Sequence, residues 1–160
     1  MRAMGSGSRR KAYKPRDQKL TSAIMSAVRS KDNKAEVILR RELWKCGYRY
    51  RLYDSNLPGK PDLVFKSLRL VVFVDGDFWH GRSLIEGGLR SFRRLIRTPR
   101  WEWWLTKISR NVERDRRASR ELKALGWNVI RFWESSVLAD STKAAGRVIR
   151  ALDRARCRQP

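Results

Sequence analysis

Residues 61–80 of the chain, PDLVFKSLRLVVFVDGDFWH, decide its fold and hold most of its chemistry. The run LVVFV at residues 70–74 is continuously apolar, which is typical of a central strand that is buried on both faces. A shorter apolar piece at residues 62–65 precedes it, and Gly76 follows it at a bend. We therefore expect two neighbouring strands whose ends carry acidic and histidine side chains.

Helical and extended patterns alternate on either side of this segment. Apolar residues at helical spacing predict three helices, over residues 32–46, 101–125 and 141–156. Aromatic and apolar runs predict further strands over residues 48–53 and 127–133. We interpret the Gly- and Arg-rich residues 81–100 as irregular. This order of elements predicts an α/β fold in which a central mixed β-sheet is flanked by helices.

The chain is far more basic than an average globular protein. Its 160 residues include 38 Lys and Arg against 16 Asp and Glu, which leaves a net charge of +22. A field of this sign attracts polyanions, and nucleic acid is the usual one. An anionic membrane is the alternative partner, but no run approaches the ~18 apolar residues of a transmembrane helix. We expect a flexible basic arm over residues 1–19 and a single domain over residues 20–156.

Cysteine usage and the first residues point to the cytoplasm. Residues 1–20 are basic and polar, so no apolar core of a secretion signal follows the start. Cys46 and Cys157 lack a CxxC partner, and we interpret them as reduced thiols of a cytoplasmic protein.

The ends of the two central strands carry the candidates for metal-assisted hydrolysis of a phosphodiester. Mg²⁺ takes oxygen ligands, which the Asp62 and Asp75 side chains and the Val74 backbone carbonyl can supply. His80 is the only histidine, and a neutral imidazole can accept a proton from the attacking water. Taken singly, each of these residues has an ordinary alternative in a turn or in the core. Their order favours the site: a carboxylate, an apolar strand, then a second carboxylate and the histidine.

Several segments resemble the very-short-patch repair (Vsr) endonucleases in order and spacing. They are MSAVRSKDNKAE (25–36), LPGKPDLVF (57–65), VVFVDGDFWHG (71–81), WWLTKISRNVERDRR (103–117) and LGWNVIRFWE (125–134). The resemblance covers residues 20–140. It implies a restriction-endonuclease-like core, related to the PD-(D/E)xK nucleases. It also implies Mg²⁺-dependent nicking of one strand beside a T:G mismatch left by deamination of 5-methylcytosine, with Mn²⁺ able to substitute.

The resemblance also implies roles for single residues. Asp62 matches the metal-bridging aspartate, and Val74 matches the position whose backbone carbonyl binds the metal. His80 matches the catalytic histidine, proposed as general base, and Glu36 an acidic residue that reaches the metal-bound waters. Asp75 stands where the family has Asp or His, so a direct or a water-mediated role is implied.

Aromatic and basic side chains are the candidate DNA contacts. By the same resemblance, aromatic residues enter the duplex beside the mismatch, where unstacking costs less: Phe78, Trp79, Trp104 and, with them, Trp103. The candidates for phosphate contacts are Lys60, Arg110, Arg114 and Arg117, although a charged helix face is usually just solvated. We interpret the remaining periodic tryptophans as packing residues: Trp44, Trp127 and Trp133.

The chain departs from the family at its structural zinc, which is bound by Cys and His in better-known members. The corresponding positions here are Asp77, Arg82, Leu84 and Ser135. These residues are not a soft ligand set, so we expect no structural zinc and a loop over residues 81–100 that packing holds.

Three functions stay open on the sequence. The first is the strand-nicking mismatch endonuclease, for which the resemblance implies mismatch-repair proteins and a cytosine methyltransferase as functional partners. The second is a restriction or defence nuclease of the same fold that acts on fully paired DNA, which the divergent loop favours. The third is a basic DNA-binding module without catalysis, although its acidic groups would repel phosphate. We expect a monomer, because a single-strand nick needs one active site.

Overall fold

The computed structural model describes residues 33–96 and 98–158. Its centre is a four-stranded sheet in the order β1-β2-β3-β4. The strands are β1 (Arg51–Leu52), β2 (Leu63–Phe65), β3 (Leu70–Asp75) and β4 (Asn128–Trp133). The first three pair antiparallel and β3 pairs parallel with β4, which confirms the predicted mixed sheet. The basic arm expected over residues 1–19 lies outside the described residues.

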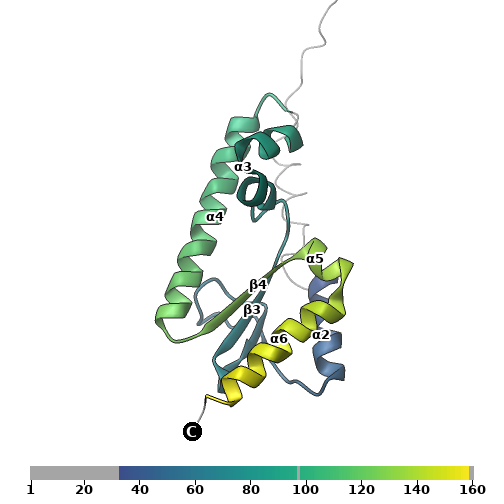
Figure 1. Ribbon diagram of the computed structural model, residues 1–160. Coiled ribbons are helices and arrows are strands. Elements are labelled where there is room, and N and C mark those ends of the chain that lie inside the picture. The colour runs from purple at the N-terminus through teal and green to yellow at the C-terminus, as the bar shows by residue number, and fades with distance from the viewer. Residues whose placement is uncertain (1–32, 97, 159–160) are drawn as a thin grey trace, which may run out of the picture. The chain divides into compact units, whose positions relative to one another are not determined.

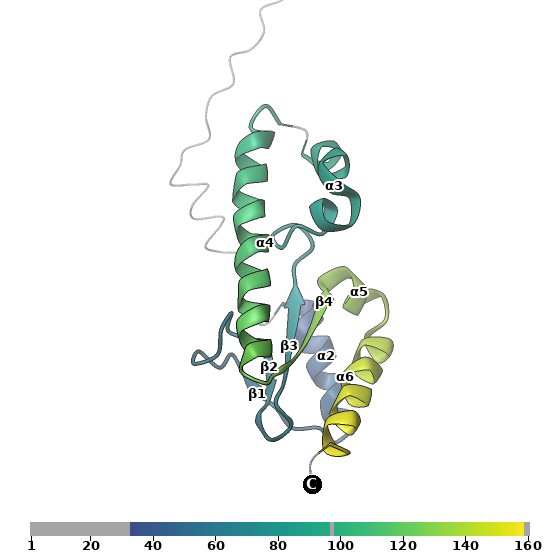
Figure 2. The same cartoon turned by 60° about the vertical axis from the view of Figure 1, so that its left-hand side comes forward.

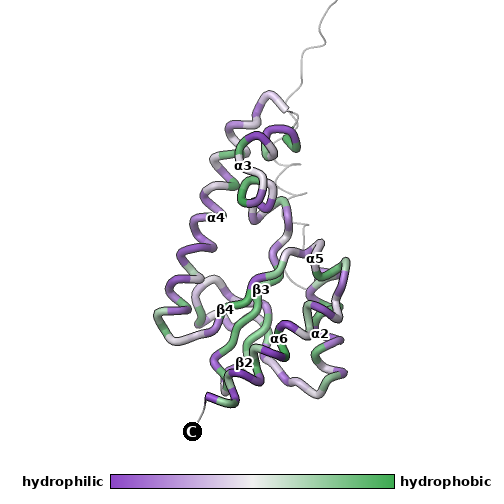
Figure 3. Tube along the Cα trace, in the orientation of Figure 1, coloured by the Kyte–Doolittle hydropathy of each residue, from purple (hydrophilic) through white to green (hydrophobic). Residues whose placement is uncertain are grey.

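Helices cover both faces of the sheet (Figures 1 and 2). The helices α2 (Lys34–Lys45), α5 (Glu134–Ala139) and α6 (Ser141–Arg156) lie on one side, and α4 (Trp101–Ala124) lies on the other. Successive side chains of a strand point to opposite faces. Val72 and Val74 therefore join the core under α2 and α6, whereas Val71 and Phe73 join the core under α4. The apolar residues concentrate along the central strands in Figure 3.

The parallel pairing of β3 with β4 fixes where a site can form. All six residues of β3 are buried, including the five apolar residues 70–74 for which the sequence predicts burial. Asp75 at the end of β3 lies opposite Trp133 at the end of β4. Two parallel strands need a long crossover connection, and the chain between β3 and β4 includes the long helix α4. The carboxyl ends of β3 and β4 therefore meet at one edge of the sheet, beside α4.

The interpretation of residues 81–100 as irregular was wrong. Residues Arg82–Leu95 form α3, a helix broken at Gly88, where φ is 65° and ψ is −170°. Phe92 and Ile96 bury themselves against Ile108 and Val112 of α4. Exposed arginines on the outer side of α3 interrupt the helical spacing of its apolar residues. For this reason the sequence pattern did not predict a helix.

Two smaller expectations also need correction. The strand expected over residues 48–53 is only the two residues of β1, and Trp44, expected in the core, is 53% exposed. Both Cys46 and Cys157 are free and exposed. Among the described residues, no helix is both long and apolar enough to cross a membrane.

Candidate active site

Asp62 is held in place by β3, at the point where β2 begins. Its backbone N–H donates to the Val72 carbonyl at 3.0 Å, and its Oδ2 accepts from the Val74 N–H at 2.7 Å. These two bonds fix the carboxylate beside Val74, the residue whose carbonyl is the second expected metal ligand.

The surroundings of Asp62 disfavour its negative charge. Burial raises the pKa of Asp62 to about 7. The nearby carboxylates of Glu36 and Asp75 also raise this pKa, whereas the hydrogen bond from Val74 lowers it. A bound divalent cation would remove this penalty, because an adjacent positive charge favours the ionised carboxylate. Within residues 33–96 and 98–158, no three His, Cys, Asp or Glu side chains are grouped to hold an ion. One carboxylate beside a backbone carbonyl suits a hard cation such as Mg²⁺, which usually keeps several waters in its shell.

Glu36 lies in the first turn of α2 and is almost fully buried, with 1% exposure. The Asn33 side chain caps this turn by accepting from the Glu36 N–H at 2.8 Å. The Glu36 carboxylate accepts from Arg40 and from the Tyr53 hydroxyl, both at 2.7 Å. The structure thus brings Glu36 close enough to Asp62 to influence its pKa, with its own charge already balanced by Arg40.

His80 ends the turn after β3 and points at α4. Its Nδ1 lies 2.6 Å from Oδ2 of Asp115 and 3.3 Å from Oδ1 of Asp75. Burial opposes ionisation of Asp115, but the hydrogen bond and charge of His80 and the nearby arginines outweigh it and lower the pKa of Asp115. Asp115 is therefore a carboxylate without a hydrogen, so Nδ1–H of His80 donates to it. The Nε2 atom is then the one that can accept a proton.

The sequence analysis missed Asp115, although a signal was present. Asp115 shares the inner stripe of α4 with buried Ile108, Val112, Ala118 and Leu122. A carboxylate in register with an apolar stripe needs a hydrogen-bond partner, and His80 is that partner.

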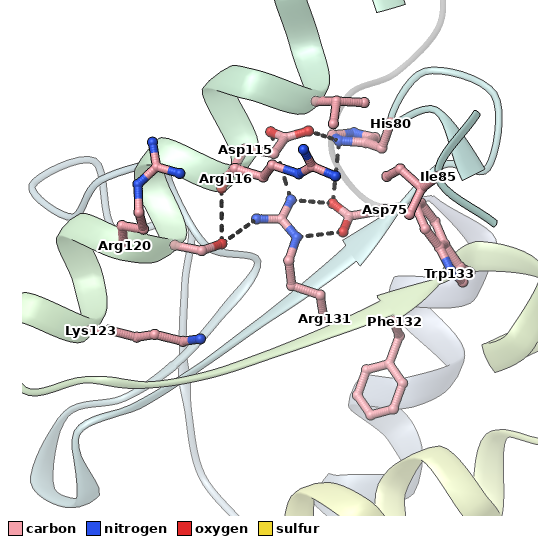
Figure 4. Close-up of a pocket in the computed structure, with 12 residues that line it drawn as sticks. Asp75, His80, Ile85, Asp115, Arg116, Arg120, Lys123, Arg131, Phe132 and Trp133 are labelled. Carbon is pink, nitrogen blue, oxygen red and sulfur yellow. Dashed lines mark hydrogen bonds and ion pairs between the residues drawn. The ribbon is translucent and has the colours of Figure 1, made fainter. Parts of the chain in front are cut away.

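Arg131 of β4 was also missed, and it holds Asp75 at two points. Nε and Nη2 of Arg131 donate to Oδ2 and Oδ1 of Asp75 at 2.7 and 2.6 Å. Figure 4 shows Asp75, His80, Asp115 and Arg131 pointing toward one another. They line a cavity of about 400 Å³ between α4 and the end of β4. The signal in the sequence was a single charged residue inside the apolar strand NVIRFW.

The four expected wedge residues form one aromatic cluster. The ring centroids of Phe78 and Trp104 lie 5.3 Å apart, and those of Phe78 and Trp79 lie 5.0 Å apart. Trp103 stacks edge-on to Trp104 at 4.9 Å and is 53% exposed. The other three are partly buried against the core of α3 and α4, so Trp103 is the member that solvent reaches most.

The expected phosphate contacts are all exposed. Lys60 lies in the loop before Asp62 and has a positive φ of 51°. The other three, Arg110, Arg114 and Arg117, lie along α4. Nε of Arg117 is 3.8 Å from Oε1 of Glu121. The structure places these cations at the surface, where phosphates could reach them.

The positions that match the family's zinc ligands form a hydrogen-bonded clasp of Asp77, Arg82 and Ser135. Asp77 accepts from Arg82 Nη1 at 2.8 Å and from the Ser135 hydroxyl and N–H at 2.7 and 3.0 Å. Arg82 also contacts the Ser135 hydroxyl. Leu84 instead packs against the core beside Phe92. The clasp ties the turn that carries His80 to the start of α5.

Comparisons with known proteins agree with this architecture. A family model described as DNA mismatch endonuclease Vsr matches residues 14–86. The Type II nicking enzyme V.NmeDIP of Neisseria meningitidis serogroup C is 38% identical, over 80% of this chain and 82% of its own. The Type II nicking enzyme V.XorIIP of Xanthomonas oryzae is 40% identical, over 81% and 90%. The DNA mismatch endonuclease Vsr of Escherichia coli is 37% identical, over 76% and 73%.

Proposed function

The chain belongs to the Vsr family of DNA endonucleases, and from this premise we propose that it nicks one strand of duplex DNA beside a T:G mismatch, with Mg²⁺ as its cofactor. The observation that carries the proposal is the hydrogen-bonded pair of His80 and Asp115, which lies against Asp75 at the end of the strand whose Val74 N–H binds the Asp62 carboxylate. A DNA-binding module would gain nothing from a histidine oriented by a half-buried aspartate.

Asp62 and the Val74 carbonyl would hold the cation, which neutralises developing charge on the phosphate and makes water more acidic when bound. Nε2 of His80 accepts a proton from the water as the water oxygen attacks phosphorus. The bond from phosphorus to the bridging oxygen then breaks, and that oxygen takes up a proton from solvent as it leaves. Asp115 holds the imidazole in the required tautomer and stabilises the imidazolium that forms.

Selection of the mismatch belongs to the aromatic cluster. An apolar side chain that enters a base step must unstack it, and a mismatched step costs less to open. Trp103 is exposed beside Trp104, and the Lys107 ammonium lies 5.1 Å from the centroid of the Trp103 ring. This placement supports a role in which the cluster touches bases while lysine and arginine side chains touch phosphates.

The proposed substrate connects this reaction to the methylation of cytosine in DNA. A T:G mismatch of this kind arises when 5-methylcytosine loses its amino group, so a cytosine methyltransferase creates the need for the enzyme. Mismatch-repair proteins are the proposed partners that act on the nicked product.

The test uses end-labelled duplexes that differ in one base pair. One carries a central T:G in varied sequence contexts and the other is fully paired, each with Mg²⁺. We expect nicking of the T-bearing strand in the mismatched duplex alone. Equal cleavage of both duplexes would contradict the repair role and favour restriction or defence. Binding without cleavage in every context, with Mn²⁺ as well, would contradict the enzyme.

A further inference from the structure

We propose that Arg131 binds Asp75 in place of a metal ion, so that the site takes a single divalent cation, at Asp62. The inference rests on the proposed metal site and deepens it, because it separates the two aspartates that the sequence treats alike. Asp62 becomes the metal ligand, and Asp75 becomes the anchor of a fixed positive charge.

The contacts of Asp75 leave little room for a metal ion. Each of its oxygens accepts a hydrogen bond from Arg131, and Oδ1 also lies 3.3 Å from Nδ1 of His80. The residue is only 5% exposed. A bidentate pair of this kind is the strongest that an arginine forms with a carboxylate. By contrast, the Asp62 carboxylate accepts a hydrogen bond from a backbone N–H, that of Val74, at 2.7 Å.

Arg131 is itself held from three further sides. Its Nη1 donates to the Ser119 hydroxyl at 3.2 Å, and its guanidinium carbon lies 4.3 Å from the centroid of the Phe73 ring. Its Nη2 is 3.7 Å from Oδ1 of Asp115, whose other oxygen is bonded to His80. These contacts fix the guanidinium before any ligand arrives.

The energetics oppose an exchange of Arg131 for a metal ion. If Asp75 turned to a cation, Arg131 would lose its partner while a second positive charge arrived beside it. Arg131 already balances Asp75 and lies 3.7 Å from Asp115, and Arg40 balances Glu36, so Asp62 is the carboxylate that a divalent cation would neutralise before DNA binds. A second cation would leave an excess of positive charge at the edge of the sheet.

Binding of Mn²⁺ without DNA, followed by calorimetry and by electron paramagnetic resonance, tests the inference. Wild type should bind one Mn²⁺, and Asp62→Asn should lose it. The charge-balanced double variant Asp75→Asn/Arg131→Gln should still bind one Mn²⁺, within about threefold of the wild-type affinity, the scale of indirect effects. Arg131→Gln alone frees both oxygens of Asp75 and should gain a second Mn²⁺.

Two Mn²⁺ ions in wild type would overturn the inference. So would a fall of roughly 10- to 100-fold in the Mn²⁺ affinity of the double variant, the loss expected when a group that supports a metal is removed. Because this assay contains no DNA, it separates the two claims. If the protein binds one Mn²⁺ but leaves a mismatched duplex intact, the proposed function alone is refuted. If it binds two Mn²⁺ and nicks the mismatched duplex, the inference alone is refuted.

Discussion

Nδ1 of His80 lies 2.6 Å from Oδ2 of Asp115, a residue 35 positions further along the chain on α4. The turn that carries His80 is held to the same helix, because Asn111 donates to the Trp79 carbonyl at 3.1 Å. The helix therefore orients both the backbone and the ring of the histidine, and leaves Nε2 as its free proton acceptor.

The first prediction concerns the pKa of His80. Burial lowers this pKa, but the bond and charge of Asp115 and the charge of Asp75 outweigh it, so it lies above the usual 6.5. Because His80 is the only histidine, its ring signal in a proton NMR titration is unambiguous. Asp115→Asn should shift the midpoint to lower pH, since the neutral amide no longer stabilises the imidazolium. An unchanged midpoint would contradict the pairing.

The second prediction concerns stability against pH, with chelator present. The pKa of Asp62 rises from 3.8 when unfolded to about 7 when folded, mainly through burial. The folded state then holds the proton more tightly, so stability is full below pH 4 and falls as pH rises toward 7. Asp62→Asn should match wild type near pH 4 and exceed it at pH 8, by on the order of 4 kcal/mol of unfolding free energy.

Urea denaturation at the two pH values measures this difference. Asp54→Asn is the matched control, because the Lys66 hydrogen bond lowers the pKa of Asp54 and the sign is reversed. If wild type were as stable as Asp62→Asn at pH 8, the raised pKa of Asp62 would be contradicted.

The third prediction concerns the clasp of Asp77, Arg82 and Ser135. Asp77→Ala removes three hydrogen bonds of a partly exposed carboxylate, and should lower the unfolding free energy by about 1 to 2 kcal/mol. Glu86→Ala removes a more exposed partner of the same Arg82 and should cost less than about 0.5 kcal/mol. A zinc chelator should not change the urea midpoint of wild type. A fall in that midpoint would show that zinc supports the fold.

The fourth prediction compares two tryptophans that are each 53% exposed, Trp103 and Trp44. Trp103→Ala should weaken binding of a T:G duplex roughly tenfold or more, because a base loses its stacking partner. Trp44→Ala, on α2, should leave that affinity unchanged, and neither variant should alter the melting temperature much. Fluorescence anisotropy with a labelled duplex measures both. Equal losses for the two variants would contradict a specific wedge.

Local patterns in the sequence predicted most of the fold. The periods of α2, α4 and α6 and the apolar runs of β3 and β4 follow directly from the packing of each element. The helix α3 was not predicted because its arginines interrupt the helical spacing of its apolar residues. The exposure of Trp44 was not predicted because periodicity does not reveal which helix face another element covers.

The candidate site was predicted in part, for the same physical reason. Asp62 comes just before β2 and His80 follows β3, its antiparallel neighbour, so spacing along the chain predicts that both lie at the same end of these strands. Arg131 lies 56 positions from Asp75, and only the crossover through α4 brings the two together. Pairings of this kind depend on tertiary structure, and a single sequence does not encode them in any local pattern.

The most direct test of the account is the single-turnover nicking rate on a T:G duplex with Mg²⁺, for wild type, Asp62→Asn and His80→Gln. We predict that wild type nicks the T-bearing strand, and that each variant binds the duplex but nicks it at least about 100-fold more slowly. Nicking at the wild-type rate by either variant would contradict an active site built on Asp62 and His80.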